Sequence, residues 1–460
     1  MKLQQFEVPG LAHYSYLLAS QGKALVIDPR RDIDVYLKYA ETNRLSITHV
    51  LETHIHADYA SGATALAKVT SAQLWLSGHD EGEDYAYQFA HRKFRDGDEV
   101  ELGDLRLVAV HTPGHTPEHL SFLVYEKSRC GQPVALFTGD FIFVGSVGRP
   151  DLLGEEAKTR LAHLLYQSVR TRVDNLPDGV ELYPGHGAGS LCGAGMGERE
   201  HSTLGYERFC NVFMADRPEA EFVDILLKTL PPAPDYYRRM KHLNSEGPPL
   251  LESIPGAEAH SAAKFRELAD TLEAVIIDLR RPEAFGGAHI PKSLNIGAGQ
   301  NLSMWAGWVV AYDRPILLVG NDGTDLEAAR RSLIRVGLDD VRGYLKGGMA
   351  AWIEAGFEQE YLPQQSVREL ADQLAERPFV LDVRSQGEWN SGHIAGATHI
   401  PGGELPKRTH DVPQDRPVHV VCGSGYRSSI AASVLARAGF QHIINIAGGM
   451  GAWKEQNLPT

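Results

Sequence analysis

Short apolar runs alternate with polar segments through the first half of the chain, a pattern typical of β-strands. Seven runs stand out: KALVIDP, THVLETH, AQLWLSG, LRLVAVHTPGH, HLSFLVYE, PVALFTGD and VELYPGHG. Few helical patterns separate them before Glu155. Several runs end in His or Asp where a loop begins. Because strand ends are rigid and loops vary, such positions are suited to hold the ligands of a functional site.

The second half of the chain contains one internal repeat, which fixes domain boundaries better than local propensity does. VIIDLRRPEAFGGAHIPKSLNI (275–296) parallels FVLDVRSQGEWNSGHIAGATHI (379–400). Further on, PILLVGNDG parallels PVHVVCGSG, and YLKGGMAAWIEAGF parallels NIAGGMGAWKEQNL. Each copy alternates apolar strands with helices. This alternation predicts an α/β domain with a parallel sheet covered by helices.

Pro, Gly and polar residues interrupt the periodicity at two places, NSEGPPLLESIPG (244–256) and EYLPQQS (360–366). We therefore predict three domains, at residues 1–243, 257–360 and 364–460. A chain of 460 residues is also too long for one ordinary core.

Composition narrows the function classes. Hydrophobic residues make up 43% and charged residues 23%, as in globular proteins, and we find no apolar run long enough to cross a bilayer. The net charge of −14 argues against a nucleic-acid or anionic-membrane surface. The first residues lack the pattern of a secretory signal, so we expect a cytoplasmic location. Four scattered cysteines do not make a disulfide framework, so any functional thiol acts singly.

Imidazole and carboxylate side chains gather at the strand ends of the first domain. In chain order they are His54, His56, Asp58, His115, Asp140 and His186. One of them alone would be a polar residue that caps a loop. Six in this order indicate a site for a first-row divalent metal, better than one for Ca²⁺ or Mg²⁺.

The motifs HIHAD, PGHT, TGD and YPGHG resemble those of the metallo-β-lactamase superfamily across the whole first domain. The resemblance implies an αββα sandwich with the metal at one edge. Binuclear hydrolases of this superfamily, such as glyoxalase II, read HxHxDH, whereas this chain has Tyr59 at the last position. A phenol must first lose a proton of pKa about 10 to become a strong ligand. We therefore expect the second metal to be weakly held or absent.

Within the superfamily, THIHAD together with GRPDLLG (148–154) resembles the persulfide dioxygenases. The resemblance implies that His54, His115 and Asp140 hold one Fe(II) ion in the N-terminal domain. Two histidines and one carboxylate form a facial triad, which leaves positions open for O₂ and a substrate sulfur. His56, Asp58 and His186 then become neighbours that orient the ligands.

Three further residues of the first domain have two interpretations each. Tyr59 either packs as a structural residue or donates a hydrogen bond to a bound oxygen species. Arg149 either binds the carboxylate or phosphate of a thiol carrier or pairs with Asp151 to hold its loop. Cys192, in HGAGSLCGAG, either contacts sulfane sulfur near the metal or is an incidental buried thiol.

The second repeat contains VVCGSGYRSS, in which a strand delivers Cys422 into a Gly-rich turn that opens a helix. Backbone N–H groups, the helix N-terminus and Arg427 together favour a reactive thiolate. The loop, with the flanking LDVR and GGM motifs, resembles a rhodanese active site. The resemblance implies that Cys422 is the sulfur-carrying nucleophile and that Arg427 stabilises anions. The loop residues Gly423, Ser424, Gly425 and Tyr426 would bind substrate.

The first repeat has lost this chemistry. The alignment places Gly320 at the cysteine and Asp325 at the arginine. An acidic residue there would repel sulfite or thiosulfate, so we expect no transfer activity from this copy. Its role would be structural, a docking surface or a vestigial pocket.

Together these resemblances predict an enzyme that oxidises a low-molecular-weight thiol persulfide with O₂ to sulfite and thiol. Cys422 would then transfer sulfur, forming thiosulfate or persulfide. The residues do not distinguish glutathione, coenzyme A, bacillithiol or another thiol as carrier, and the resemblance permits a homo-oligomer. Two alternatives stay open: a binuclear zinc thioester hydrolase of glyoxalase II type with a fused sulfurtransferase, and a non-oxidising sulfur carrier.

Overall fold

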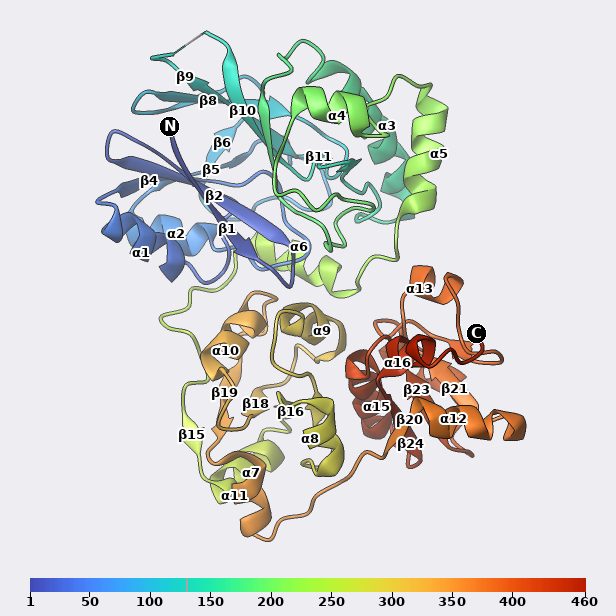
Figure 1. Cartoon of the computed structure of the whole chain (residues 1–460). Coiled ribbons are helices and arrows are strands. Elements are labelled where there is room, and N and C mark those ends of the chain that lie inside the picture. Colours follow the sequence, from blue (N-terminus) through green and yellow to red (C-terminus); the bar gives the residue numbers. More distant parts are fainter. Residues whose placement is uncertain (130) are drawn as a thin grey trace. The chain divides into compact units, whose positions relative to one another are not determined.

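The computed structural model describes residues 1–129 and 131–460. The chain forms two compact units (Figure 1). The first contains Met1–Glu252 with Ile334–Gly337, and the second contains Ser253–Leu333 with Leu338–Thr460. Within the described part of the chain, no helix is both long and apolar enough to cross a membrane.

Two six-stranded sheets form the centre of the first unit. The first sheet follows chain order: β1 (Lys2–Val8), β2 (His13–Ser20), β3 (Lys23–Ile27), β4 (Ser46–Leu51), β5 (Gln73–Ser77) and β6 (Arg92–Phe94). Strands β1 to β3 are antiparallel, and β3 to β6 are parallel. The second sheet has the order β14 (Ser202–Thr203), β13 (Glu181–Pro184), β10 (Pro133–Gly139), β9 (Leu120–Glu126), β8 (Leu105–His111) and β7 (Glu99–Leu102). Strands β11 (Ile142–Phe143) and β12 (Ser146–Val147) form a small separate ribbon.

Apolar side chains on the facing sides of the two sheets form the core of this unit. Leu18 and Leu25 from the first sheet pack in one cluster with Leu107, Phe122 and Phe137 from the second. Because alternate residues of a strand point to opposite faces, the outer faces need their own cover. Helices supply it, so that the unit is an αββα sandwich, as the sequence predicts (Figure 1).

Helices α1 (Asp34–Thr42) and α2 (Ala63–Thr70) cover the first sheet, where Tyr36 and Leu66 join its outer residues. Helices α3 (Glu155–Thr171) and α5 (Glu219–Thr229) cover the second sheet through Leu165 and Phe222. Two more helices complete the unit, α4 (Leu204–Cys210) and α6 (Tyr236–Glu246).

The second unit contains the two repeats, each built on a five-stranded parallel sheet. The orders are β15-β19-β18-β16-β17 and β20-β24-β23-β21-β22. The first copy runs β15 (Ala259–His260), α7 (Ala262–Thr271), β16 (Val275–Asp278), α8 (Pro282–Gly287), β17 (Leu294–Asn295), α9 (Leu302–Val309), β18 (Ile316–Val319), α10 (Leu326–Ile334), β19 (Val341–Leu345) and α11 (Gly348–Glu354).

The second copy repeats this order. It runs β20 (Gln364–Ser366), α12 (Val367–Gln373), the 3₁₀ helix η1 (Leu374–Glu376), β21 (Phe379–Asp382), α13 (Gln386–Asn390), β22 (Thr398–His399), α14 (Leu405–Arg408), η2 (Thr409–Asp411), β23 (Val418–Val421), α15 (Tyr426–Arg437), β24 (Ile443–Ala447) and α16 (Gly449–Glu455). The aligned residues also match in detail. Arg280 pairs with Asp278, and Arg384 with Asp382, each at 2.6 Å between Nη2 and Oδ2. The predicted duplication is therefore confirmed at the level of single contacts.

Candidate metal centre and cysteine loop

The predicted ligands lie on four loops at the same edge of the two sheets of the first unit. His54, His56 and Asp58 follow β4, and His115 lies between β8 and β9. Asp140 directly follows β10, and His186 follows β13 by one glycine. The backbone of Gly185 donates to the carbonyl of Gly139 at 2.8 Å, which holds the last two loops together. All six side chains are buried.

Three of these residues direct ligand atoms toward one point. His115 Nε2 and His54 Nε2 lie 3.4 and 3.8 Å from Asp140 Oδ2. The ligand atoms of all three residues fall within 4.8 Å of one another. Among the described residues, His115 Nε2 and Asp140 Oδ2 are buried without a hydrogen-bond partner. Because orphaned buried polar atoms are costly, their convergence fits a metal ion that satisfies them.

The remaining polar atoms of the same three residues are held by the protein. His54 Nδ1 lies 2.9 Å from Thr53 Oγ1, and His115 Nδ1 lies 2.9 Å from the carbonyl of Arg149. Since a carbonyl only accepts, His115 Nδ1 carries the proton and Nε2 keeps a free lone pair. Asp140 Oδ1 is 2.7 Å from His186 Nδ1. Such partners orient metal ligands and fix their tautomers.

The protonation of the two imidazoles agrees with this arrangement. Burial, and then the neighbouring His56, hold the pKa of His54 well below its ordinary value. Burial, His119 and Lys241 do the same for the pKa of His115. Both rings are therefore neutral at neutral pH, which is the form that binds a metal.

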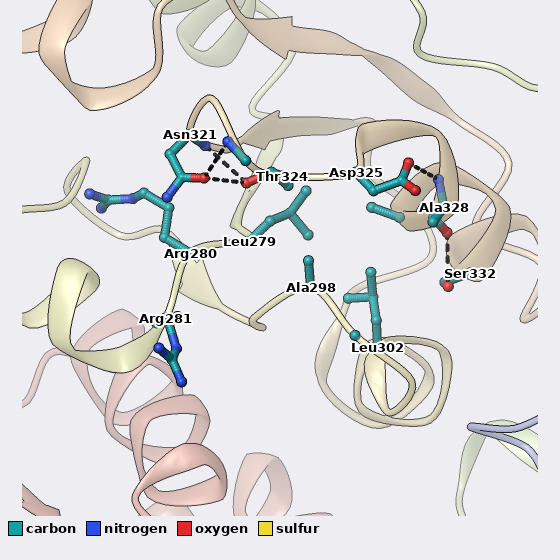
Figure 2. A pocket seen from close by; sticks show the side chains of 13 residues that line it. Leu279, Arg280, Arg281, Ala298, Leu302, Asn321, Thr324, Asp325, Ala328 and Ser332 are labelled. Carbon is teal, nitrogen blue, oxygen red and sulfur yellow. Dashed lines mark hydrogen bonds between the residues drawn. The ribbon is translucent and has the colours of Figure 1, made fainter.

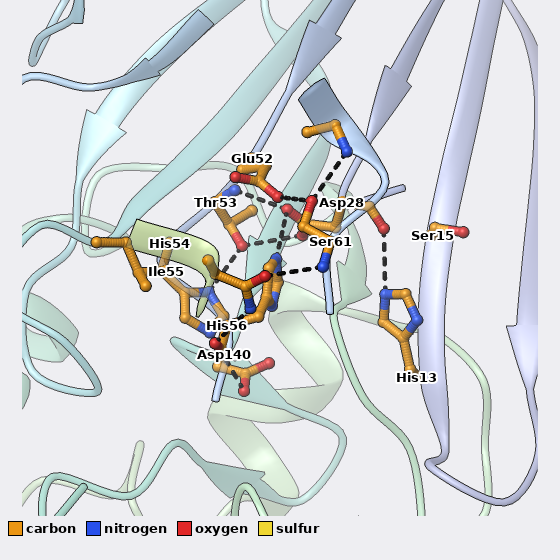
Figure 3. Close-up of polar contacts among 12 residues, drawn as sticks. His13, Ser15, Asp28, Glu52, Thr53, His54, Ile55, His56, Ser61 and Asp140 are labelled. Carbon is orange, nitrogen blue, oxygen red and sulfur yellow. Dashed lines mark hydrogen bonds and ion pairs between the residues drawn. The ribbon is translucent and has the colours of Figure 1, made fainter. Parts of the chain in front are cut away.

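Asp28, at the end of β3, organises the loop that follows β4 (Figure 3). Its Oδ1 accepts from the backbone N–H of Thr53 at 2.7 Å and lies 3.1 Å from His56 Nε2. Its Oδ2 accepts from the hydroxyl of Thr53 at 2.9 Å. Because this hydroxyl proton is donated to Asp28, Thr53 Oγ1 accepts from His54 Nδ1 and leaves His54 Nε2 free. Asp28 thus fixes the tautomer of a ligand that it does not touch.

Helix α6 holds the same loop from the other side. Asn244 Nδ2 donates to the carbonyls of His56 and Tyr59 at 2.8 and 2.7 Å, and Asn244 Oδ1 accepts from the backbone of Ser61 at 2.8 Å. The ammonium of Lys241, one turn earlier, donates to the carbonyl of Ile55 at 2.9 Å. This clamp comes from a helix nearly two hundred positions away along the chain.

A second cluster lies beside the first, and its atoms are less available. Asp58, His186 and Cys192 place ligand atoms within 4.8 Å of one another. However, both His186 nitrogens already contact carboxylates, Asp140 at 2.7 Å and Asp58 at 2.9 Å. Burial lowers the pKa of His186, but the two carboxylates outweigh it and raise that pKa well above its ordinary value. Burial also raises the pKa of the Cys192 thiol.

Tyr59 packs rather than pointing at the ligand atoms. Its ring stacks on His13 at 3.9 Å between centroids, and its hydroxyl donates to the carbonyl of Asp28 at 3.3 Å. Burial, and then Asp28, raise its pKa well above the ordinary value. A phenolate is therefore disfavoured at this position, where the binuclear motif has its histidine.

Arg149 is enclosed, which favours the second of its two interpretations. Its guanidinium pairs with Asp151 at 2.7 and 2.8 Å and donates to the carbonyls of Leu191 and Pro231 at 2.8 and 2.7 Å. The side chain has no exposed surface. These donors already hold the loops around the site, and binding of a substrate anion by Arg149 stays a prediction.

The sequence motifs did not identify several residues that the structure places at this site. Asp28 ends the run KALVIDP, so its place at a strand end could have marked it. His119, which is not among the six candidate ligands, accepts from the backbone of Asp140 at 3.0 Å. Asn244 and Lys241 have no local pattern, because only the path of α6 brings them to the loop.

The Cys422 loop of the second repeat has the geometry expected of an anion cradle. Cys422 Sγ accepts from the backbone N–H of Gly425 at 3.1 Å and from the hydroxyl of Ser428 at 3.3 Å. Gly425 has φ of 101°, which a glycine tolerates. Cys422 is fully buried, while Ser424 is exposed. The loop therefore stabilises negative charge on a sulfur at its floor.

Arg427 is already paired. Its Nη1 and Nη2 contact the carboxylate of Glu388 at 2.7 and 2.6 Å. Hydrogen bonds and charge from Arg427 lower the pKa of Glu388 to about 2. The guanidinium lies over the loop, within reach of Gly423, but much of its charge is compensated.

The first repeat keeps a cavity where the second has its cysteine loop. Figure 2 shows this cavity of about 560 Å³, with Asn321, Thr324 and Asp325 along one side. The Asp325 carboxylate accepts from the backbone of Ala328 at 2.9 Å, so a negative charge caps the helix that would otherwise face an anion. Asp325 therefore disfavours an anion at this side of the cavity, although Arg280 and Arg281 also line it.

Comparison with known proteins identifies both parts of the chain. The model of the metallo-beta-lactamase superfamily matches residues 8–186. The model of the rhodanese-like domain matches twice, at residues 261–355 and 366–456.

Individual relatives cover different lengths. A metallo-beta-lactamase structure from Staphylococcus aureus is 35% identical with a TM-score of 0.66, over 75% of this chain and 98% of that one. The structure of ETHE1 from Myxococcus xanthus is 28% identical with a TM-score of 0.45, over 53% and 98% of the two chains. The hydroxyacylglutathione hydrolase of Francisella philomiragia is 31% identical over 183 residues, which are 38% of this chain and 63% of that protein. The chain thus spans less than two thirds of the curated relatives that it matches.

Proposed function

Since the chain belongs to the metallo-β-lactamase superfamily and carries two rhodanese-like domains behind that domain, we propose that it is a persulfide dioxygenase with a fused sulfurtransferase. The substrate is a low-molecular-weight thiol persulfide, and the co-substrate is O₂. The metal is one Fe(II) ion held by His54, His115 and Asp140.

This proposal rests mainly on a difference in how available the ligand atoms are in the two clusters, His54–His115–Asp140 and Asp58–His186–Cys192. In the first, ligand atoms converge and among the described residues two of them lack any other partner. In the second, one oxygen of Asp58 also lacks a partner in the described part of the chain, but His186 is engaged by two carboxylates, and Tyr59 replaces the histidine that would complete a second site. One metal with open positions suits oxidation, whereas hydrolysis by the binuclear route needs two.

The overall reaction balances as RSSH + O₂ + H₂O → RSH + SO₃²⁻ + 2H⁺. The sulfane sulfur loses four electrons, and O₂ accepts four. An Fe(II) ion would supply the redox chemistry that makes O₂ reactive toward this sulfur. The protein keeps His54 and His115 neutral through burial and directs each Nε2 inward. His186 holds a proton between Asp140 and Asp58, so the carboxylate that serves as ligand stays oriented.

The second activity belongs to Cys422. Its thiolate attacks the terminal sulfur of a persulfide, giving Cys422–SSH and RS⁻. Sulfite then takes that sulfur as thiosulfate and returns the thiolate. The N–H of Gly425 and the hydroxyl of Ser428 donate to the sulfur that carries the charge.

The test combines metal analysis with an oxygen electrode. The full chain, loaded with iron, should contain about one iron per chain, as occupation of the His54, His115 and Asp140 cluster alone requires. It should consume O₂ with glutathione persulfide, coenzyme A persulfide or another thiol persulfide in a panel. No O₂ uptake with any of them would defeat the proposal and leave a sulfur carrier or a hydrolase as the remaining roles.

A thioester hydrolase is the second candidate, because hydroxyacylglutathione hydrolases are among the relatives and Asp58, His186 and Cys192 form a second cluster. Two zinc ions per chain together with turnover of S-lactoylglutathione would favour it over oxidation. The same metal analysis distinguishes the two candidates.

A further inference from the structure

A cavity opens at the seam between the two rhodanese-like copies, beside the Cys422 loop. Its volume is about 300 Å³, enough for a small organic ligand. Residues of both copies line it: Leu279, Arg281, Pro282, Glu283, Gly297 and Ala298 from the first, and Ser424 and Tyr426 from the second. The first copy therefore forms most of a wall that faces the reactive loop of the second.

Buried contacts fix the two copies at this seam. Asn295 Oδ1 accepts from the hydroxyl of Ser429 at 2.6 Å, and the Asn295 backbone donates to Ser433 Oγ at 3.1 Å. Tyr426 donates its hydroxyl proton to the carbonyl of Gly297 at 3.1 Å. Phe285 of the first copy packs into the apolar core of the second.

Aromatic side chains of α9 close the same seam on another side. The ring of Trp308 packs on Gly403, where an added Cβ would lie only 2.1 Å from the ring. Trp305 approaches Gly402 in the same way, with 3.0 Å to an added Cβ. These glycines permit close packing between the copies.

Two opposite charges in this cavity are uncompensated. Arg281 and Glu283 both line it and both are exposed, and in the described part of the chain neither makes a hydrogen bond or ion pair through its side chain. The neighbouring arginines differ, because Arg280 is paired with Asp278 and Arg427 with Glu388. Arg281 also lines the first copy's own cavity, where its side chain points away from Asn321 and Asp325 (Figure 2). Glu283 lies in the first turn of α8, where a negative charge interacts favourably with the helix dipole. This interaction does not explain why a positive charge is placed at Arg281.

We propose that Arg281 and Glu283 bind the zwitterionic α-amino acid group of the thiol that exchanges sulfur with Cys422. The guanidinium takes the carboxylate, and the carboxylate of Glu283 takes the ammonium. Ser424 and Tyr426, two and four residues after Cys422, then lie beside the thiol end of the same molecule. The inactive copy thereby selects amino-acid-bearing thiols such as glutathione over coenzyme A, which has no ammonium group.

This inference rests on the proposed sulfur transfer, and steady-state kinetics of the full chain test it. Thiosulfate is the sulfur donor, and three thiols are acceptors: glutathione, glutaryl-Cys-Gly, which is glutathione without its amino group, and 2-mercaptoethanol. Because exposed charge pairs contribute up to about 1 kcal/mol, Glu283→Gln should raise KM for glutathione by roughly three- to fivefold. It should leave KM for glutaryl-Cys-Gly and 2-mercaptoethanol unchanged. Arg281→Gln should raise KM for the first two acceptors and not for 2-mercaptoethanol.

Two control variants test whether the change in KM comes from the cavity itself or from the loss of any surface charge. Arg368→Gln in α12 and Glu376→Gln in η1 remove one exposed charge each from the second copy, away from the cavity. Both should leave all three KM values at the parent level, with kcat unaltered.

The outcomes are distinguishable. If the parent chain transfers no sulfur to any thiol, the proposed sulfurtransferase activity fails. If transfer is normal but Glu283→Gln affects glutathione no more than glutaryl-Cys-Gly, the zwitterion site is wrong while transfer stands. An effect of Arg281→Gln on all acceptors alike, including 2-mercaptoethanol, would indicate that Arg281 binds thiosulfate, and it would also overturn the inference.

Discussion

Single hydroxyl and amide groups decide which atoms the metal site presents. Thr53 lies between Asp28 and His54, with its proton donated to one and its oxygen accepting from the other. The chain offers an internal comparison, since Thr48 Oγ1 lies at the same 2.9 Å from Nδ1 of its neighbour His49, and both residues are half-buried in β4. A Thr–His pair therefore occurs both beside the metal site, as Thr53 and His54, and away from it, as Thr48 and His49.

Thr53→Val should weaken metal binding at nearly constant volume. The change removes the acceptor for His54 Nδ1–H and a donor to Asp28, which frees the imidazole to rotate or change tautomer. We expect metal affinity to fall about 10- to 100-fold, as for other partners of metal ligands. Metal retained during competition with a graded chelator measures it. Thr48→Val is the matched control, and equal retention by the two variants would contradict the role given to Thr53.

At the level of elements, strand ends position the ligands and one helix locks their loop. Asp28, His54 and Asp140 follow strands that end at a common edge. Their side chains therefore lie close together once the two sheets have formed. Helix α6 adds what the strands lack, because Asn244 and Lys241 satisfy the carbonyls of Ile55, His56 and Tyr59 in the loop after β4. Buried backbone groups without partners cost stability, so the helix is part of the site.

Asn244→Ala should loosen this loop. It leaves the carbonyls of His56 and Tyr59 and the N–H of Ser61 without their partners, at about 1 to 3 kcal/mol for each buried group that finds no water. We expect metal to be lost to a chelator at least about tenfold faster, by the same reasoning as for indirect partners of ligands. Arg238→Ala, on the exposed side of α6, should behave as the parent chain. Unchanged metal release in Asn244→Ala would show that α6 does not hold the site.

At the scale of the whole molecule, the two proposed activities belong to separate cores. The metal cluster lies within the first unit, and Cys422 lies in the second, each with its own apolar cluster. Variants at one site should therefore leave the chemistry of the other intact, because mutations at sites that share no partners act independently.

Cys422→Ser should abolish transfer from thiosulfate to thiols while O₂ uptake with a persulfide continues, and sulfite should accumulate in place of thiosulfate. His115→Ala should do the reverse, because it removes a metal ligand and leaves the Cys422 loop untouched. Oxygen uptake and thiosulfate formation, measured on each variant, check both expectations. Transfer that survives in Cys422→Ser would mean that Cys192 or another thiol carries sulfur.

The sequence by itself determined the fold class, the duplication and the set of candidate ligands. Strand periodicity, the repeated motifs and His or Asp at strand ends are local patterns, and local patterns are visible along the chain. It also marked Cys422, because a Gly-rich turn between a strand and a helix has a distinctive composition.

Only the tertiary structure decided which groups are free to react. Arg149 looked like an anion-binding residue, but Asp151 and two carbonyls from distant segments engage it. Arg427 likewise proved to be paired with Glu388, and the unpaired Arg281 of the inactive copy came to lie near the Cys422 loop. The physical reason is that the availability of a charge or lone pair depends on which partners folding brings within hydrogen-bond distance, and several of those partners, such as Leu191, Pro231 and Glu388, are far away in the sequence.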